Sequence, residues 1–319
     1  MESRKGMENV LVTGGAGYIG SHVVKMLIEK DYNVIVLDNL STGSIDLLNN
    51  KSKNIIGDFG DIQLLRNTFK HNNIDIVMHF AAFSIVNESN KNALKYYKNN
   101  VSNTINLLCV MMENKVKNFI FSSSASVYGS PKEMPIKEDT ICNPESVYGK
   151  TKFIIENILK DCNEINSVVL RYFNAAGSDS DIGEIHNPET HIIPLLMTTN
   201  NFKVFGTDYS TPDGTAIRDY IHVNDISNAH ILSIQSLDKE YSIYNIGNNS
   251  GYSVKQIITK VKEISGRKIN IIESDRRDGD PEELIADSTK IKNELGWKPE
   301  QSDIETIIKT AWEWHKNEI

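Results

Sequence analysis

Residues 10–22 read Val10-Leu11-Val12-Thr13-Gly14-Gly15-Ala16-Gly17-Tyr18-Ile19-Gly20-Ser21-His22, and this stretch decides the fold. A short apolar run leads into a glycine-rich turn, after which apolar residues recur at helical spacing. Gly14 and Gly17 let the backbone bend and approach phosphates, and Gly20 lets the helix pack closely on the strand. The helix N-terminus presents free N–H groups to an anion. The stretch therefore predicts a site for the pyrophosphate of a dinucleotide.

The glycine run alone does not separate a dinucleotide site from an ordinary glycine loop between a strand and a helix. A second apolar run, residues 34–37, ends in Asp38, which follows Gly20 by 18 residues. A carboxylate at this place can accept hydrogen bonds from both hydroxyl groups of an adenosine ribose, and it would repel a 2′-phosphate. The sequence therefore favours NAD over NADP.

Size and composition exclude several classes of protein. The chain has 319 residues, a mass of 35.9 kDa and a formal net charge of −8, which argues against binding of nucleic acid. No apolar run approaches the length of a membrane span, and residues 1–6 are polar, so we expect a cytoplasmic protein that does not enter a membrane. Cys109, Cys142 and Cys162 lack C-x-x-C spacing, so no disulfide or zinc site is indicated and we expect packing residues.

Strand patterns alternate with helical patterns in the first half of the chain, which predicts an α/β fold with a Rossmann-like, doubly wound parallel sheet. After the first two strands we expect strands at 53–58, 74–82, 119–124 and 168–174, and helices over 92–114 and from Tyr148. Beyond Gly177 the pattern changes to loops and short elements. We therefore expect an NAD-binding domain at 1–176 and a smaller mixed α/β substrate domain at 177–319, with a segment near 220–250 returning to the first domain.

The second half of the chain gives fewer clear signals. Its expected strands are 203–206, 218–223 and 244–247, and its expected helices begin at Asp225, run from 253 to 264 with a Ser253 cap, and run from 304 to 315. Residues 276–280 form a charged loop. In the first half, His79 is interpreted as a packed core residue. Asp58 could hold the adenine amino group or cap the helix that opens at Ile62.

Tyr148 and Lys152 are four residues apart on an expected helix, so both side chains rise from one face. The ammonium group and a nicotinamide ring would both favour the phenolate and bring the pKa of Tyr148 down from about 10 toward neutral. Ser124, at the end of the fifth strand, can hydrogen-bond the same substrate hydroxyl. A Y-x-x-x-K pair alone usually marks a solvated helix face. Combined with the glycine turn and Asp38, it predicts a hydride-transfer site.

Eight blocks of sequence form one pattern between Val10 and about His315: 14–20, 37–40, 79–82, 121–129, 148–152, 171–174, 213–223 and 276–280. Together they resemble the extended short-chain dehydrogenase/reductase family, and within it the epimerases that invert C4 of UDP-galactose and UDP-glucose. The glycine turn and the Y-x-x-x-K pair are shared across the superfamily, whereas the last three blocks are specific to the epimerases.

The resemblance implies a role for each residue of the site. Tyr148 would take the proton of the sugar's 4-hydroxyl, Lys152 would tune that phenol and hold the nicotinamide ribose, and Ser124 would orient the hydroxyl. Hydride would pass from C4 to permanently bound NAD, the 4-keto sugar would turn about its link to the diphosphate, and hydride would return to the opposite face. The expected NAD contacts are Gly14, Gly17, Tyr18, Ile19, Gly20, Asp38, Asn39, Leu40, Ser41, Thr42, Gly43, Asp58, Phe59, Phe80, Ala81, Ala82, Ser84, Asn99, Tyr148, Lys152 and Phe173.

The UDP-sugar is expected to contact a set that lies mostly in the second half of the chain: Ser124, Asn174, His191, Phe205, Arg218, Tyr220, Arg277 and Asp280. Two arginines converging on a diphosphate supply forked, charge-assisted donors, and an anchored nucleotide leaves the hexose free to rotate. From the residues alone, surface ion pairs are the preferred interpretation of both arginines, for instance Arg218 with Asp219 and Arg277 with Asp278.

Some positions depart from the family pattern. Many relatives carry lysine where Ser84 stands, which leaves that cofactor contact open. Some epimerases carry tyrosine where Leu284 stands; leucine could admit an N-acetyl group, so the alternative function is a dual-specificity or UDP-N-acetylglucosamine 4-epimerase. Related 4,6-dehydratases carry Asp-Glu in place of Ala125-Ser126, and decarboxylases usually carry glutamate at 126, so neither elimination nor decarboxylation is expected. Another nucleotide-sugar epimerase and a non-catalytic NAD-binding protein are the remaining alternatives.

Family members commonly pair through two helices that correspond here to residues 92–114 and 151–161. The apolar residues Tyr96, Tyr97, Ile105 and Leu108 fit such a four-helix interface, and they fit equally well a helix packed on the sheet. The resemblance implies a homodimer.

Overall fold

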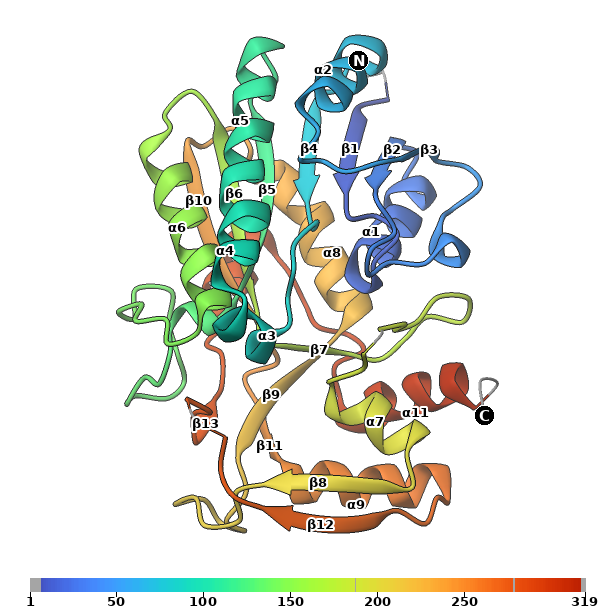
Figure 1. Ribbon diagram of the computed structural model, residues 1–319, viewed down its shortest axis with the longest axis vertical. Helices are drawn as coiled ribbons and strands as arrows, with labels where there is room; N and C mark the ends of the chain where they lie inside the picture. Colours follow the sequence, from blue (N-terminus) through green and yellow to red (C-terminus); the bar gives the residue numbers. More distant parts are fainter. Residues whose placement is uncertain (1–6, 187, 278, 317–319) are drawn as a thin grey trace.

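The computed structural model describes residues 7–186, 188–277 and 279–316, and within them seven strands form one parallel sheet (Figure 1). The strand order is β10-β6-β5-β4-β1-β2-β3, and every neighbouring pair is parallel. The strands are β1 (Asn9–Thr13), β2 (Asn33–Asp38), β3 (Lys53–Ile56), β4 (Ile76–His79), β5 (Asn118–Ser124), β6 (Asn166–Tyr172) and β10 (Tyr241–Ile246). This order confirms the Rossmann-like, doubly wound fold class.

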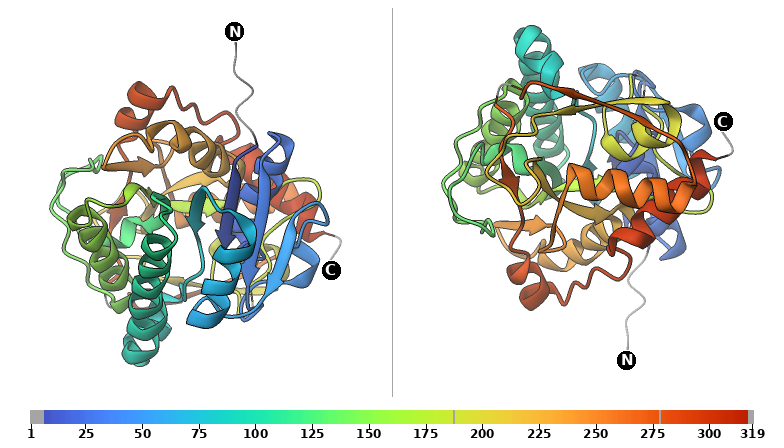
Figure 2. Two further views of the ribbon diagram at one scale, coloured as in Figure 1. Left: turned by 90° about the horizontal axis from the view of Figure 1, so that it is seen from above. Right: turned by 90° about the horizontal axis from the view of Figure 1, so that it is seen from below.

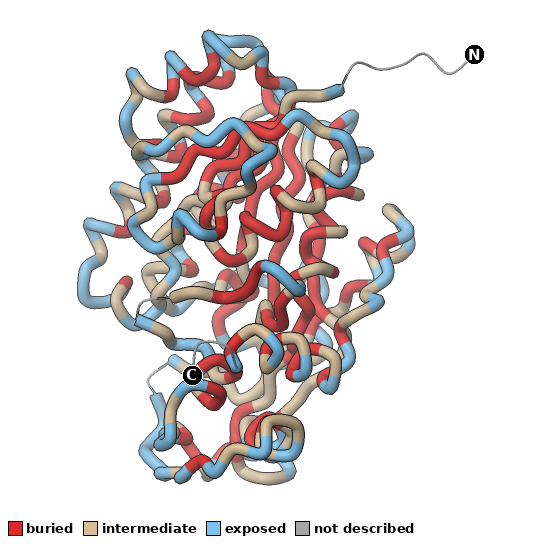
Figure 3. The backbone as a smooth tube through the Cα atoms, turned by 90° about the vertical axis from the view of Figure 1, so that its right-hand side faces the viewer, coloured by how far each residue is buried: buried red, intermediate tan, exposed pale blue. Residues whose placement is uncertain are grey.

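Helices cover both faces of this sheet, as the views in Figure 2 show. On one face, α1 (Tyr18–Glu29) and α8 (Val223–Ser233) pack together over the strands, and α10 (Thr289–Leu295) lies beside β10. On the other face lie α2 (Ile62–Asn72), α5 (Asn103–Glu113) and α6 (Val147–Asp161). The central strands are therefore buried on both sides, which explains why they read as continuous apolar runs (Figure 3).

The helix expected over residues 92–114 is not one α-helix. It consists of α4 (Ala93–Tyr96), a wider π-turn η2 (Tyr97–Ser102), and α5, and it follows α3 (Val86–Lys91). The π-turn places the buried Asn100 side chain so that it accepts from the backbone N–H of Phe83 and donates to the Phe83 carbonyl, and it donates to the Thr151 hydroxyl. The irregular turn therefore ties the loop after β4 to α6.

Beneath the seven-stranded sheet lies a smaller assembly, which we call the lower region (Figure 1). One of its sheets joins β7 (Asn174–Ala176), β9 (Ile217–His222), β11 (Gly251–Ser253) and β13 (Glu283–Leu284), and β8 (Asn201–Phe205) pairs with β12 (Asn270–Ser274). Three helices, α7 (Ile192–Thr198), α9 (Val254–Ser265) and α11 (Ile304–His315), enclose a separate apolar cluster with these strands. The chain reaches the lower region through β7 and returns to the upper sheet at β10.

Several local predictions for this half of the chain are confirmed, including the strand at 203–206, the helix at 304–315 and the cap of α9. Ser253 and Gln256 form a reciprocal capping box at that helix start. The helix expected from Asp225 instead begins at Val223, where the His222 side chain accepts from the Asn224 N–H. The elements β7, β12, β13, α7 and α10 carried too short or too mixed a pattern to be predicted.

Two further expectations concern isolated residues. All three cysteines are free, as expected, but Cys109 is exposed on α5 and is not a packing residue. His79 is buried, with its two ring nitrogens hydrogen-bonded to Thr13 (2.6 Å) and Thr104 (2.9 Å), which confirms the core interpretation.

Among the described residues, no helix has the length and apolar character that crossing a membrane requires. Residues 1–6, whose polarity entered the localisation argument, lie outside the described part of the chain.

Candidate active site

The glycine turn between β1 and α1 is tightly packed where the motif predicts it. Gly14 has φ +76°, and a Cβ there would lie 2.5 Å from the backbone nitrogen of Ala81. A Cβ on Gly20 would lie 2.1 Å from the Gly14 carbonyl oxygen, so this position also excludes any side chain. Helix α1 starts directly after the turn, at Tyr18, and its first residues line the same cleft as the turn, where the first N–H groups of a helix have no partner within it. The turn can therefore receive a pyrophosphate at a helix N-terminus.

Asp38 lies at the end of β2, beside this turn, and is 8% exposed. Its two carboxylate oxygens accept from the backbone N–H groups of Ala16 (2.9 Å) and Leu40 (2.8 Å), which fixes the carboxylate at the edge of the cleft. A carboxylate has about four lone-pair sites, so two remain for ribose hydroxyls. The glycine turn and this oriented carboxylate fit the diphosphate and ribose of NAD.

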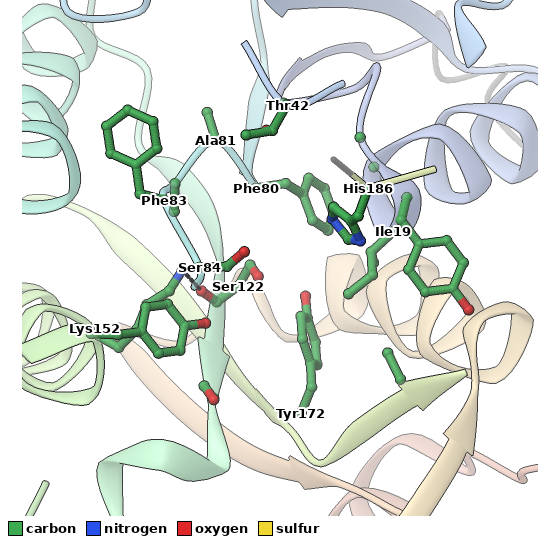
Figure 4. Close-up of a pocket in the computed structure, with 18 of the residues that line it drawn as sticks. Ile19, Thr42, Phe80, Ala81, Phe83, Ser84, Ser122, Lys152, Tyr172 and His186 are labelled. Atoms are coloured by element: carbon green, nitrogen blue, oxygen red, sulfur yellow. Dashed lines mark hydrogen bonds between the residues drawn. The ribbon is translucent and has the colours of Figure 1, made fainter. Parts of the chain in front are cut away.

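One cleft runs from the glycine turn along the carboxyl ends of the strands to α6 and β7 (Figure 4). All but three of the expected NAD contacts line it; the exceptions are Leu40, Gly43 and Asp58. Asp58 does not cap α2 either, because the N-cap is Asp61, which accepts from two backbone N–H groups. The cleft is also lined by residues that sequence reasoning did not select: Leu37, Gly57, Phe83, Val86, Ser122, Ser123, Ser126, Tyr172, Ala175, Glu184 and His186.

Ser124, Tyr148 and Lys152 meet in this cleft. Ser124 ends β5, and the other two lie one turn apart at the start of α6, whose N-cap Ser146 accepts from the Gly149 N–H. The Lys152 ammonium donates to the Ser122 carbonyl (2.6 Å) and lies 5.8 Å from the centroid of the Tyr148 ring. The three side chains are therefore placed by one strand end and one helix turn.

The electrostatics of this trio differ from the sequence expectation. Burial raises the pKa of Tyr148 to about 12, and only the hydrogen bond with Ser124 lowers it. Burial also lowers the pKa of Lys152 to about 7, against a raising contribution from Glu156. In the chain without NAD, burial therefore outweighs Lys152 in setting the pKa of Tyr148. That the ammonium and an oxidised nicotinamide together lower this pKa stays a prediction for the NAD-bound protein.

Behind the trio lies a buried ionic network that sequence reasoning missed. Arg171 on β6 makes two hydrogen bonds to the Glu156 carboxylate, at 2.6 and 3.0 Å, and the pair is at most 5% exposed. Glu156 also accepts from the Ser123 hydroxyl at 2.5 Å, next to Ser124. The network therefore fixes the end of β5 against α6. Its available signal was the carboxylate four residues after Lys152 on the same helix face.

The expected nucleotide contacts divide between the cleft and the lower region. Asn174 and His191 line the cleft, and Asn174 on β7 pairs in register with Tyr220 on β9. The other contacts gather on β9, at the end of β8 and in the loop after β12: Arg218 forms an ion pair with Asp280, and the Arg277 guanidinium lies 3.8 Å from the centre of the Phe205 ring.

The surface ion pair expected between Arg218 and Asp219 does not form. The two side chains alternate along β9, and Asp219 is fully buried, where it accepts from the backbone N–H groups of Asn248, Asn249 and Ala286. Asp278, the other expected partner, lies outside the described residues. Arg218 is instead held by Asp280, across 62 residues of sequence.

Comparison with known proteins identifies the family. Residues 11–311 match the family described as GDP-mannose 4,6 dehydratase. The chain is 45% identical to a UDP-glucose 4-epimerase of Lactobacillus helveticus, over 97% of both chains. Its structure resembles the Bifidobacterium longum UDP-glucose 4-epimerase in complex with NAD⁺ and UDP (TM-score 0.92, 38% identity, 97% and 98% of the two chains). It also resembles the Campylobacter jejuni UDP-Glc/GlcNAc 4-epimerase (TM-score 0.84, 38% identity, 97% and 99%).

The description of the matching family names a dehydratase, but this chain carries Ala125 and Ser126, not the two acids that the resemblance leads us to expect of a dehydratase. Both positions lie in η3 (Ala125–Val127), directly after Ser124, and neither can supply a proton-transfer carboxylate there. The relatives of nearly equal length carry the epimerase name instead. The chain therefore belongs to the UDP-glucose 4-epimerase family, NAD-dependent isomerases within the extended short-chain dehydrogenases/reductases.

Proposed function

We propose that this chain interconverts UDP-galactose and UDP-glucose by inverting C4 of the hexose. The observation that supports it most strongly is the meeting of Ser124, Tyr148 and Lys152 in one cleft with the glycine turn. Similarity to epimerases over nearly the whole chain supports the same reaction. Bound NAD would supply the reversible hydride acceptor that the reaction needs.

In this proposal each side chain of the trio has one task. The Tyr148 phenolate would take the proton from the 4-hydroxyl, and NAD, when bound, would supply the acceptor for the hydride that C4 gives up. Ser124, which hydrogen-bonds Tyr148, directs the same oxygen. Lys152 is held by the Ser122 carbonyl, from where it would hold the nicotinamide ribose. Return of hydride to the other face and of the proton to the oxygen completes the inversion, with no net oxidation.

The lower region would hold the nucleotide while the sugar turns. Arg218 and Arg277 lie on neighbouring segments, and Phe205 adds an aromatic ring beside Arg277, whereas the expected contact Tyr220 is buried in the apolar cluster of the lower region. Guanidinium groups bind diphosphates through paired, charge-assisted hydrogen bonds. A site built in this way grips the UDP part and leaves the hexose to the cleft between Asn174 and Ser124.

A second candidate function is supported by Leu284. It lies on β13, pairs in register with Arg218, and packs against an apolar cluster that includes Phe173, which lines the cleft. Leucine is smaller than tyrosine, so it would leave more room than tyrosine next to this cluster. We infer that UDP-N-acetylhexoses are also accepted as substrates.

We propose in addition that the protein forms a homodimer through α4 and α5 with α6. Large apolar side chains on these helices remain exposed in the single chain: Leu94 is 84% exposed, Met112 45% and Ile105 39%. Apolar exposure on one helical face is typical of an interface. A dimeric mass by light scattering would support this proposal, and a monomeric mass would refute it. The cytoplasmic location expected from the sequence stays a prediction.

One assay tests both candidate reactions. The purified chain is incubated with UDP-galactose, or with UDP-N-acetylgalactosamine, without added cofactor, and the products are identified by NMR. Formation of UDP-glucose is the expected result for the first substrate, and formation of UDP-N-acetylglucosamine for the second. Retained NAD without any product from either sugar would refute the proposed function in favour of a non-catalytic NAD-binding protein.

A further inference from the structure

The short helix α3 packs against α6, the helix that carries Tyr148 (Figure 1). The chain enters α3 directly from the loop after β4, and residues 81–84 of this loop line the cleft. One short segment therefore borders the place expected for NAD and also contacts the helix of the expected base.

The contact between α3 and α6 includes the backbone of Tyr148 itself. The first N–H groups of a helix have no partner within it, so they need acceptors from elsewhere. In α6 the N-cap Ser146 accepts from the Gly149 N–H at 3.0 Å, which is an ordinary capping contact. The Tyr148 N–H donates instead to the hydroxyl of Ser89 on α3, also at 3.0 Å. A side chain that is 59 residues away in sequence therefore holds the backbone of Tyr148.

The Ser89 hydroxyl has a fixed direction. Ser89 is fully buried, and its hydroxyl donates its one proton to the Val86 carbonyl at 2.6 Å. Only the lone pairs of this oxygen are then left for other contacts, and one of them accepts the Tyr148 N–H. The hydroxyl is thus oriented as an acceptor toward α6.

Helix α3 is in turn held from α4. The hydroxyl of the fully buried Tyr96 lies 2.8 Å from the Ile85 carbonyl oxygen and 2.9 Å from the Glu88 carboxylate. Lys95 donates to the same carboxylate at 2.7 Å. These contacts fix both ends of the turn that precedes Ser89, so the acceptor for Tyr148 lies on an anchored element.

Loss of this acceptor should move the phenol more than the ammonium of the trio. Tyr148 is the second residue of α6, and helices fray from their ends. Lys152 lies one turn further into the helix, and its ammonium is held separately by the Ser122 carbonyl. A displacement of about 1 Å between reacting groups can cost about a hundredfold in rate.

We propose that Ser89 is a positioning residue for the reaction: its hydroxyl holds the backbone of Tyr148 so that the phenol reaches the substrate oxygen beside Ser124. This role rests on the proposed function, in which Tyr148 is the base. Asn90, the next residue of α3, assists from the surface, where its side-chain oxygen accepts from the Val147 N–H at 3.0 Å.

The test compares Ser89→Ala with Ser146→Ala in the full chain with its retained NAD. Each variant loses one hydroxyl acceptor at the start of α6, but only Ser89→Ala frees the Tyr148 N–H. We expect Ser89→Ala to lower kcat for UDP-galactose about tenfold, and Ser146→Ala to lower it less than about threefold. KM and retained NAD should stay at the parent level, because none of the expected contacts of the UDP-sugar or NAD lies on α3.

The split between kcat and KM separates positioning from general damage. Parent kcat in folded Ser89→Ala would overturn the role of Ser89. An equal fall in Ser146→Ala would also overturn it, because the helix start as a whole would then place the phenol. A raised KM or a loss of NAD that accompanies the fall would indicate damage to the cleft and would overturn it as well. If Ser89→Ala does not fold, Ser89→Cys, which supplies a weaker acceptor, takes its place.

A second readout needs no turnover. Ultraviolet difference titration of the NAD-loaded chain, with Tyr148→Phe as the baseline, follows the ionisation of Tyr148. Burial raises the pKa of Tyr148 and the hydrogen bond with Ser124 lowers it, so a displaced phenol should titrate at higher pH in Ser89→Ala. Absence of turnover by the parent chain would refute the proposed function alone. A titration curve of Ser89→Ala that coincides with that of the parent would overturn the role of Ser89.

Discussion

The cleft below the seven-stranded sheet and the arginine site of the lower region are built differently. In the cleft, Ser124, Tyr148 and Lys152 are fixed by a strand end, a helix start and a buried ionic network behind them. In the lower region, Arg218 is held by the Asp280 carboxylate and the Ile217 carbonyl, and the Arg277 guanidinium lies over the Phe205 ring. The first arrangement suits chemistry that needs fixed positions, and the second suits a nucleotide grip that forms around its ligand.

The sharpest contrast should be in stability. Glu156→Ala leaves the buried guanidinium of Arg171 without its partner and should lower the free energy of unfolding by about 3–5 kcal/mol. Asp208→Ala breaks the exposed ion pair with Arg276 in the lower region, and the free energy of unfolding should stay nearly unchanged. Denaturant unfolding of both variants checks this. Equal losses would contradict the distinction between a rigid and an adaptable site.

The pH dependence of the rate tests the cleft. Because the base must be the phenolate, the rate should fall about tenfold per pH unit below the pKa of Tyr148 in the NAD-loaded enzyme. In the chain without NAD, burial raises the pKa of Tyr148 to about 12. If the rate begins to fall only at a pH well below 12, the charge of the bound nicotinamide has lowered this pKa. Ser124→Ala removes a lowering hydrogen bond and should move this fall to higher pH. The measurement is a profile of kcat against pH. If Ser124→Ala leaves the pH at which kcat falls unchanged, the hydrogen bond between Ser124 and Tyr148 is contradicted.

The lower region can be probed separately through the nucleotide. Arg218→Lys keeps the charge but loses the forked geometry, so the Kd for UDP should rise about tenfold while retained NAD stays constant. Arg276→Lys is the matched control, since its guanidinium lies over Tyr209 and pairs with the exposed Asp208. Calorimetry with UDP measures both. Loss of NAD from the Arg218 variant would show that the two regions do not divide the ligands as proposed.

The smallest expected effect lies where the two regions meet, at Leu284. Leu284→Tyr should lower kcat/KM for UDP-N-acetylgalactosamine about tenfold relative to UDP-galactose, because the larger ring adds bulk against the apolar cluster that contains Phe173. The ratio of the two substrates is its own control for general damage. An equal fall for both sugars would place the acetamide elsewhere in the cleft.

The same contrast explains what the sequence could predict. The parallel sheet, the glycine turn, Asp38 and the trio follow from apolar runs that end in polar residues, because parallel strands bring their carboxyl ends to one edge. The pairing of Arg218 with Asp280 spans 62 residues and carries no local pattern, so only family resemblance pointed to those positions. Glu184, His186 and His191 line the cleft from an irregular segment, and sequence reasoning selected only His191 among them.

The charge state of Tyr148 shows a second limit. Spacing placed Lys152 next to the phenol correctly, but it could not show that burial would outweigh the ammonium in setting both pKa values. Desolvation depends on how completely strands and helices enclose a group, which no local pattern contains. The network of Glu156 and Arg171 depends on the same enclosure.

The most direct test of the central claim is the turnover of UDP-galactose by Tyr148→Phe, measured beside retained NAD and the Kd for UDP. Tyr32→Phe, which lies outside the cleft, is the matched control. Loss of a positioned general base should lower kcat by about a hundredfold or more, with NAD content and UDP binding at the parent level. Turnover by Tyr148→Phe equal to that of the parent enzyme would contradict the account.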